Sequence, residues 1–409
     1  MNSEYHRGHD VLDISPLSFE GDFDTQLKEV LDYIRMSRED VEKLQILFND
    51  LQEIFGNTWK GSQLEVFGSV VTGLALRNSD VDCLVNLPPW LDEPRATFVI
   101  EARKILRRNR KFQNIFAITK AKVPIIQFRY VPTNTNCDVS FSTRAAIRNS
   151  KLLESMIFSD ERILPLAVLV KYWSKVHCFT GTNLMSSYSL TLLFIFYLQQ
   201  KNILPSILSL QQNIDEEIVD NWNTAFSSVI DKCNNNENVY ILLGGFFKYY
   251  NNFNFEKHVI SLYTGCLIGR EKFICLENVP EEFHLYSVNV GRKICPPLRI
   301  ETAMCIQDPF NHSRNCAVAV HPKLAHKIRG IFNSAAVIYE KEPECSFLQN
   351  LLYTELAPQP NNKPVFRNVS AKNHGIKKNY KPKWNPRQMK QNGRHFKQTF
   401  QNFNRHQPC

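Results

Sequence analysis

Apolar residues recur at helical spacing through residues 25–56 and predict two consecutive helices there. Ser37 is suited to cap the second helix, because Asp40 then occupies the third helical position. Residues 1–24 show no such periodicity and are expected to be disordered. The chain is therefore predicted to begin its folded part with a pair of helices.

Shorter apolar runs follow between residues 57 and 145, and they favour β-strands. The last two predicted strands are close enough in sequence to form a hairpin. Residues 70–76 are expected to form a short helix between the first two strands. The predicted strands are residues 64–67, 80–87, 124–130 and 136–141.

Beyond Asn149 the apolar spacing becomes mainly helical again. This order of elements predicts an α+β protein with a strand-rich part and a later helical part. The predicted helices are residues 159–176, 186–200, 216–226, 239–251 and 322–339.

Three aspartates stand out in the strand-rich part. Asp80 and Asp82 are two residues apart in a predicted strand, so their side chains share one face, and Asp138 in the hairpin would lie beside them. Gly68 permits close approach of the backbone to a ligand, and Ser69 adds a hydroxyl group. Converging carboxylates predict a site for two Mg²⁺ ions. A lone Asp-x-Asp pair would instead indicate a solvated strand edge or a turn cap.

Several segments carry a resemblance to a known family. FGS at 67–69, DVD at 80–82, VPII at 123–126 and CDVS at 137–140 resemble the nucleotidyltransferase core of the DNA polymerase β superfamily. A second set of segments resembles the central domain of noncanonical poly(A) polymerases and terminal uridylyltransferases. These are LVKYWSK at 169–175, LMSSYSL at 184–190, GFFKYY at 245–250, FNF at 253–255 and IQDPF at 306–310.

The resemblance implies a two-lobed α+β nucleotidyltransferase fold. It places a mixed-sheet catalytic domain in residues 57–145 and a mainly helical central, poly(A) polymerase-associated domain in residues 146–345. The helices of residues 25–56 would pack on the central domain, and a cleft would separate the lobes. The three aspartates would be catalytic and would hold Mg²⁺ or Mn²⁺.

The resemblance also implies a nucleotide site. Lys171 and Lys175 are four residues apart, so on a helix they share one face and can meet a triphosphate together. By resemblance, Ser187 binds phosphate, Tyr188 stacks on the base, and Asn149 holds the ribose hydroxyls. A solvated helix edge for the lysines and a core position for the tyrosine are the alternatives.

Base choice is where the chain departs from the family pattern. Relatives that prefer UTP have an acidic residue after Asp-Pro-Phe and a histidine three residues later, whereas this chain has Asn311 and Arg314, with His312 out of register. Arginine only donates hydrogen bonds, so it suits uracil O4 better than the adenine amino group, which favours UTP. Asp308 is expected to orient the base edge, and Arg314 as a mere surface charge stays an alternative.

The net charge of +9 is unevenly distributed along the chain. Residues 357–409 contain twelve Lys and Arg and no Asp or Glu, which leaves residues 1–356 with a net charge of −3. This tail has too few aliphatic residues to fold and is expected to be disordered. Its aromatic residues alternate with cations, a composition suited to single-stranded RNA, although a solubilising tail or a localisation signal would look similar.

The N-terminal segment is acidic and resembles neither a signal peptide nor a transit peptide. The longest strongly apolar run, residues 190–198, is too short to span a bilayer. These features favour a cytoplasmic protein without membrane association.

Together, these observations predict template-independent addition of UMP from UTP to RNA 3′ ends. An ATP-using poly(A) polymerase is the first alternative, and a catalytically inactive RNA-binding scaffold of the same fold is the second. Which RNA is extended, and which proteins assist, does not follow from the sequence.

Overall fold

The computed structural model describes residues 11–121, 123–142 and 144–353, and the predicted basic tail, residues 357–409, lies outside them. Residues 11–22 contain no helix or strand, yet Ile14 and Phe19 are buried against the later helices. The Tyr172 hydroxyl also donates a hydrogen bond to the Leu12 carbonyl oxygen at 2.7 Å. This part of the predicted disordered N-terminus is therefore packed.

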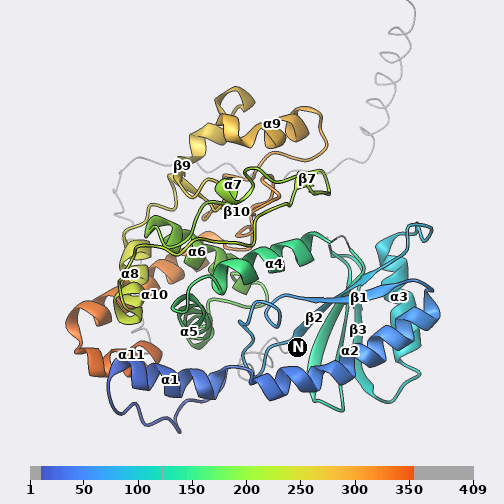
Figure 1. The fold of residues 1–409 in the computed structure, drawn as a ribbon, viewed down its shortest axis with the longest axis horizontal. Helices are drawn as coiled ribbons and strands as arrows, with labels where there is room; N and C mark the ends of the chain where they lie inside the picture. The colour runs from blue at the N-terminus through green and yellow to red at the C-terminus, as the bar shows by residue number, and fades with distance from the viewer. Residues whose placement is uncertain (1–10, 122, 143, 354–409) are drawn as a thin grey trace, which may run out of the picture. The chain divides into compact units, whose positions relative to one another are not determined.

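The strand-rich part is a five-stranded mixed sheet with the order β1-β2-β5-β4-β3. Strands β2 and β5 are parallel, and the other neighbours are antiparallel. Helices α2 (Arg38–Thr58) and α3 (Arg95–Leu106) lie beside the sheet in Figure 1. Their buried side chains pack with those of one sheet face in a common hydrophobic core. The strands are β1 (Gln63–Phe67), β2 (Val81–Asn86), β3 (Phe112–Ile118), β4 (Ile125–Tyr130) and β5 (Thr135–Ser140).

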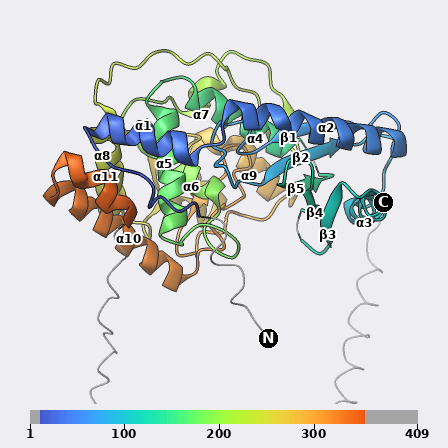
Figure 2. The same ribbon diagram turned by 90° about the horizontal axis from the view of Figure 1, so that it is seen from below.

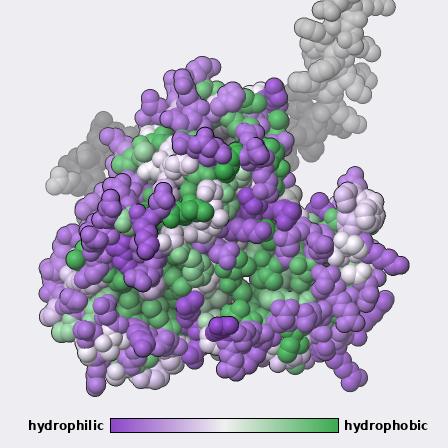
Figure 3. Space-filling model, in the orientation of Figure 1, coloured by the Kyte–Doolittle hydropathy of each residue, from purple (hydrophilic) through white to green (hydrophobic). Residues whose placement is uncertain are grey.

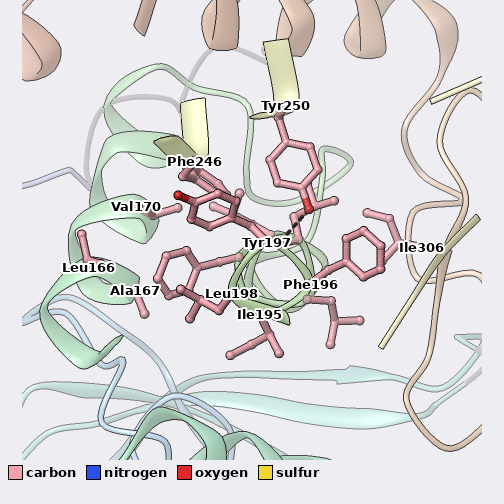
Figure 4. Close-up of a cluster of buried hydrophobic side chains, with 14 of the residues drawn as sticks. Leu166, Ala167, Val170, Ile195, Phe196, Tyr197, Leu198, Phe246, Tyr250 and Ile306 are labelled. Atoms are coloured by element: carbon pink, nitrogen blue, oxygen red, sulfur yellow. Dashed lines mark hydrogen bonds between the residues drawn. The ribbon is translucent and has the colours of Figure 1, made fainter. Parts of the chain in front are cut away.

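A second hydrophobic core is formed mainly by helices. At its centre, α6 (Ser187–Gln200) is buried almost all round, because its sequence is apolar on every side. Figure 4 shows aromatic side chains gathered at this helix, where the Tyr250 hydroxyl donates to the Leu193 carbonyl oxygen at 2.6 Å. The surrounding helices are α1 (Phe23–Ile34), α4 (Ala145–Ile157), α5 (Ile163–Val176), α8 (Val239–Asn251), α10 (Pro322–Lys341) and α11 (Glu344–Tyr353).

The first two helices serve different cores. α1 and α2 follow each other along one side of the protein in both Figure 1 and Figure 2. α1 contributes buried residues to the helical core, and α2 contributes buried residues to the sheet's core. Ser37 caps α2 as predicted, through a capping box with Asp40.

Shorter elements complete the helical part. They are α7 (Ile207–Leu210), β6 (Ile218–Val219), β7 (Trp222–Asn223), β8 (His258–Ser261), β9 (Leu267–Gly269), three 3₁₀ helices within residues 270–283, α9 (His284–Gly291) and β10 (Ile306–Gln307). The α+β fold with a mixed sheet confirms the predicted fold class, whereas the domain boundaries stay a prediction.

Two predicted helices are wrong. Residues 70–73 form turns and Leu76 forms a β-bridge with Arg35, and Gly73 has a φ of 73°, which a helix does not allow. Residues 216–226 form the β6–β7 hairpin, because Asp220 and Asn221 adopt left-handed φ values of 52° and 68°. Two such residues form the tight turn that joins antiparallel strands.

Hydrophilic residues cover much of the face seen in Figure 3, with smaller hydrophobic areas between them. Within the described ranges, no helix is both long and apolar enough to cross a bilayer.

Candidate active site

The three predicted aspartates line one pocket of about 270 Å³ between the sheet and the helical core. Asp82 and Asp138 are register partners on the parallel strands β2 and β5, so their side chains lie side by side on the same face. Asp80 precedes β2 and reaches the same pocket, while Val81 between them is fully buried in the sheet's core. The alternation predicted from the sequence therefore brings all three carboxylates together.

A tight turn at Gly68 brings the backbone against these carboxylates. Gly68 has a φ of 75°, and a Cβ atom there would collide with the Asp82 carboxylate. Ser150 on α4 fixes the turn, because its hydroxyl accepts a hydrogen bond from the Gly68 N–H at 2.9 Å. Gly68 and Ser69 both line the pocket. Glycine is required here both for its backbone conformation and for lack of space.

The carboxylates repel one another in a poorly solvated place. Burial, together with the charges of Asp138 and Asp80, raises the pKa of Asp82 to about 7 against the opposing charge of Lys171. Burial also raises the pKa of Asp138 to about 6, with a hydrogen bond from Gln127 opposing the shift and the charge of Asp80 adding to it. A cation between these groups would relieve both the repulsion and the loss of hydration.

The chemistry of this donor set fits a divalent metal ion. Hard oxygen ligands from two or three carboxylates are what Mg²⁺ takes in nucleotide-handling sites. Within the described residues, no group of three or more Asp, Glu, His or Cys side chains is arranged so that it could hold a metal ion as it stands.

Two lysines from α5 face the carboxylates across the pocket. Lys171 is 7% exposed, and its ammonium donates to the Leu74 carbonyl oxygen at 2.8 Å. Burial and the charge of Lys175 lower its pKa to about 8, while Asp82 and Asp80 favour the charged form. Lys175, one turn further along, lines the same pocket. The pair provides cations where a triphosphate would need them.

The N-terminus of α6 forms another wall of the pocket. Ser186 caps the helix by accepting a hydrogen bond from the Ser189 N–H, and Ser187 and Tyr188 follow as pocket-lining residues. The first N–H groups of a helix and a serine hydroxyl both favour an anion. Their position beside the lysines extends the phosphate-binding character of the pocket.

Asp308 connects the predicted sugar and base residues. It is 2% exposed, and its Oδ2 accepts from the Tyr188 hydroxyl at 3.3 Å and from Asn149 Nδ2 at 3.4 Å. Arg314 reaches the same oxygen through Nη1 at 3.4 Å. The buried Oδ1 of Asn149 has no hydrogen-bond partner among the residues that the structure describes, and it could accept from a ribose hydroxyl.

Asn311 and His312 differ in their surroundings and in the hydrogen bonds that they can offer to a base. The Asn311 Oδ1 accepts from the Ser313 N–H and hydroxyl, which leaves its amide group to donate. His312 is buried among the rings of Tyr263 and Phe283, and burial lowers its pKa to about 3. His312 is therefore a neutral core residue and not a base contact.

Sequence reasoning missed two supporting residues. Gln127 on β4 donates to Asp138 Oδ2 at 2.9 Å, and Ser150 holds the Gly68 turn. Gln127 could have been found, because it is a polar residue in an otherwise apolar strand facing the Asp138 strand. No local signal identified the Ser150 contact, which joins residues 82 positions apart.

The chain matches two family models. One describes the poly(A) RNA polymerase, mitochondrial-like, central palm domain and covers residues 23–157. The other describes the Cid1 family poly A polymerase and covers residues 238–314.

Individual relatives point in the same direction. Terminal uridylyltransferase 7 of Homo sapiens is 28% identical over 274 residues, covering 60% of this chain and 18% of that protein. Poly(A) RNA polymerase cid11 of Schizosaccharomyces pombe is 25% identical over 329 residues, covering 77% of this chain and 63% of that protein. The matched part of the chain thus spans less than two thirds of the length of either relative. A crystal structure of the Cid1 poly(U) polymerase with Mg 3′-dATP shares the fold, with a TM-score of 0.68 and 24% identity. The match covers 82% of this chain and 99% of that chain.

Proposed function

The chain belongs to the family of terminal uridylyltransferases and noncanonical poly(A) polymerases, and on that premise we propose that it adds ribonucleotides to RNA 3′ ends without a template. The observation that carries this proposal is the pairing of Asp82 with Asp138 in one pocket with Asp80, opposite Lys171 and Lys175. Such a pocket combines the ligands for a divalent cation with cations for a triphosphate. Few other reactions need both at one place.

The three carboxylates would hold Mg²⁺ or Mn²⁺. Bound there, the ions would lower the pKa of the RNA 3′-hydroxyl and offset the charge of the departing pyrophosphate. We infer that Asp138 would also help to take the proton of that hydroxyl. Gln127 keeps its carboxylate oriented by the hydrogen bond to Oδ2.

The remaining pocket residues would position the nucleotide. Lys171, Lys175, Ser69 and Ser187 would bind the triphosphate, the Tyr188 ring would stack on the base, and Asn149 would accept from the ribose. The Asp308 hydrogen bonds to Tyr188 and Asn149 would keep these two side chains in place. Positioning of this kind supplies much of the rate acceleration in phosphoryl and nucleotidyl transfer.

We propose UTP as the preferred nucleotide. Asp308 anchors the Arg314 guanidinium, which is 51% exposed and so still has N–H groups to offer. The Asn311 amide also remains a donor, since its oxygen is used by Ser313. Donors match the carbonyl acceptors of uracil, whereas the adenine amino group would face another donor.

ATP remains the second candidate, because adenine N1 can accept from Arg314 and one relative is described as a poly(A) polymerase. An inactive scaffold is the less favoured function. A protein without catalysis gains nothing from keeping carboxylates at a pKa of about 6 and about 7 together in a pocket.

Extension of a labelled RNA primer with each single NTP and Mg²⁺ tests both the reaction and the base choice. We expect UTP to be used most efficiently, and Arg314→Ala to lower kcat/KM for UTP about tenfold, as loss of one charged hydrogen bond would. Its effect on ATP should be smaller. Arg292→Ala, an exposed arginine at the end of α9, is the matched control and should change neither value. A wild-type preference for ATP would overturn the choice of UTP, and no incorporation of any NTP would overturn the reaction.

A further inference from the structure

One segment of the folded part is strongly cationic. Residues 102–137 contain nine Lys and Arg and no Asp or Glu, although residues 1–356 together carry a net charge of −3. The segment runs from the second half of α3 through β3 and β4 to the start of β5. The cations of this segment flank the edge strand β3 in the sequence, while the rest of residues 1–356 is acidic.

A single row of side chains crosses the sheet from the carboxylates to this edge. Asp82 on β2 is paired with Asp138 on β5, Asp138 with Gln127 on β4, and Gln127 with Phe116 on β3. Directly paired residues point to the same face of a sheet. Phe116 thus lies on the carboxylate face, two strand spacings or about 10 Å from Asp138.

A β-bulge sets this orientation. The register of β3 against β4 shifts between Gln113 and Phe116, and Asn114 within it has a left-handed φ of 51°. The extra residue turns Ile115 and Ala117 toward the sheet's core and leaves Phe116 on the opposite face. Without the bulge, the neighbour of Phe116 would occupy its place beside Gln127.

The face around Phe116 is open. Phe116 is 63% exposed and Ile118, two residues further on the same strand, is 37% exposed. Strand β3 carries no charge itself but lies between Lys111 and Lys120 in the sequence. Packing explains an exposed phenylalanine here poorly, because it contributes little to the core. The helices α2 and α3 cover only the other face of the sheet.

Further cations lie on this face and in the connection that leads into β3. Arg129 is exposed on β4, two residues from Gln127 and so on the same face, and its guanidinium donates to Asn134 Oδ1 at 2.7 Å. Arg107, Arg108 and Arg110 are exposed in the connection, and within the described ranges none of them forms an ion pair. Exposed arginines without an acidic partner suit the phosphates of a nucleic acid strand.

We propose that the carboxylate face of β4 and β3 binds the 3′-terminal segment of the RNA primer, with the Phe116 ring as a stacking platform for a base next to the 3′-hydroxyl. This inference rests on the proposed function. The row places the ring beside the carboxylates on the side away from Lys171 and Tyr188, where the incoming nucleotide would sit. An aromatic ring with flanking cations is the usual combination for single-stranded nucleic acid, and it also argues for RNA over a protein strand added to the β3 edge.

Steady-state kinetics of the full-length chain with a short single-stranded RNA primer test this proposal. Phe116→Ala should raise KM for the RNA about tenfold, as loss of one stacked base would, and should leave KM for the nucleotide unchanged. Phe116→Trp should restore the wild-type KM for RNA. The control is Trp90→Ala, which removes an aromatic side chain that is 73% exposed beyond the other end of β2, and it should change neither KM.

Photocrosslinking separates this proposal from the proposed function. A primer with 5-iodouridine at its 3′ end should crosslink to the peptide that contains Phe116, whether or not nucleotides are incorporated. A crosslink without incorporation by the wild-type chain would support the RNA surface and overturn the proposed reaction. Incorporation with an unchanged KM for RNA in Phe116→Ala and crosslinks elsewhere would overturn the surface, and the exposed strand would then belong to a protein partner.

Discussion

Asp82→Asn is expected to abolish nucleotide addition, with a loss of about 10³-fold or more in kcat/KM, and at the same time to stabilise the metal-free protein. The loss follows because the amide cannot replace a charged oxygen ligand, and each lost metal contact costs several kcal/mol of transition-state stabilisation. The fold should survive, since Asp82 lies at the pocket and not in the core. Primer extension with Mg²⁺ and a thermal unfolding scan in EDTA measure the two effects.

The gain in stability has a defined pH dependence. Asp82 has a folded-state pKa of about 7, well above the ordinary value near 3.8. A carboxyl whose pKa is raised by folding binds more protons in the native state, so wild-type stability falls as the pH rises through this interval. Asp82→Asn has no carboxyl group to ionise at this position, so its stability does not fall in this way. At pH 8 without metal it should be more stable by roughly 1 to 3 kcal/mol, and the difference should shrink toward pH 4.

The two readouts must change in opposite directions. If Asp82→Asn kept wild-type activity, the metal-site assignment would be wrong. A variant that lost activity and also lost stability at pH 8 would indicate a structural role for the carboxylate. Glu101→Gln, on α3 at the back of the sheet, serves as a control that neutralises an acidic side chain outside the pocket and should affect activity little.

Gly68→Ala is expected to reduce activity about 10²-fold and to lower the free energy of unfolding by roughly 2 kcal/mol. The left-handed φ of 75° costs any other residue about 1–2 kcal/mol. The added Cβ would also collide with the Asp82 carboxylate, and a displacement of about 1 Å at reacting groups costs about this much in rate. Chemical denaturation and primer extension on the same preparation measure both effects.

Gly61→Ala provides the matched control. Gly61 has a φ of 85°, but the nearest atom to an added Cβ is Pro88 Cγ at 3.3 Å, and Gly61 does not line the pocket. It should lose a similar amount of stability while retaining activity. Equal losses of activity in the two variants would show that backbone strain alone explains the result, and would remove the argument for a close approach at Gly68.

Part of the active site could be predicted from the sequence, because it depends on the spacing of residues within a single strand or helix. The period of two in a strand places Asp80 and Asp82 together. Asp138 joins them through the parallel pairing of β2 with β5, which spacing along the chain does not encode. The helical period places Lys171 and Lys175 on one face. For these residues, the resemblance to the polymerase family and the geometry agree.

The remaining parts depend on conformations and contacts that periodicity does not encode. Residues 216–226 have helical apolar spacing, yet Asp220 and Asn221 favour a hairpin turn. Likewise, Gly73 with a left-handed φ prevents the helix predicted for residues 70–76. Both errors arise where a polar or glycine residue adopts a left-handed conformation that outweighs the pattern of apolar neighbours.

The wider network around Asp308 shows a second limit. It joins Asn149, Tyr188 and Arg314. Asn149 and Tyr188 lie 159 and 120 residues from Asp308 in the sequence. The sequence marked each of these residues through a family resemblance, but only the structure shows that a single oxygen atom connects them. Long-range contacts of this kind have no signature in spacing.

The most direct test of the central claim is anomalous diffraction from crystals of the wild-type protein grown with Mn²⁺ and a non-hydrolysable UTP analogue. The account predicts anomalous peaks within coordination distance of Asp80, Asp82 and Asp138, with the triphosphate extending toward Lys171 and Lys175. Mn²⁺ bound away from these carboxylates, or a nucleotide bound with no ion at them, would contradict it.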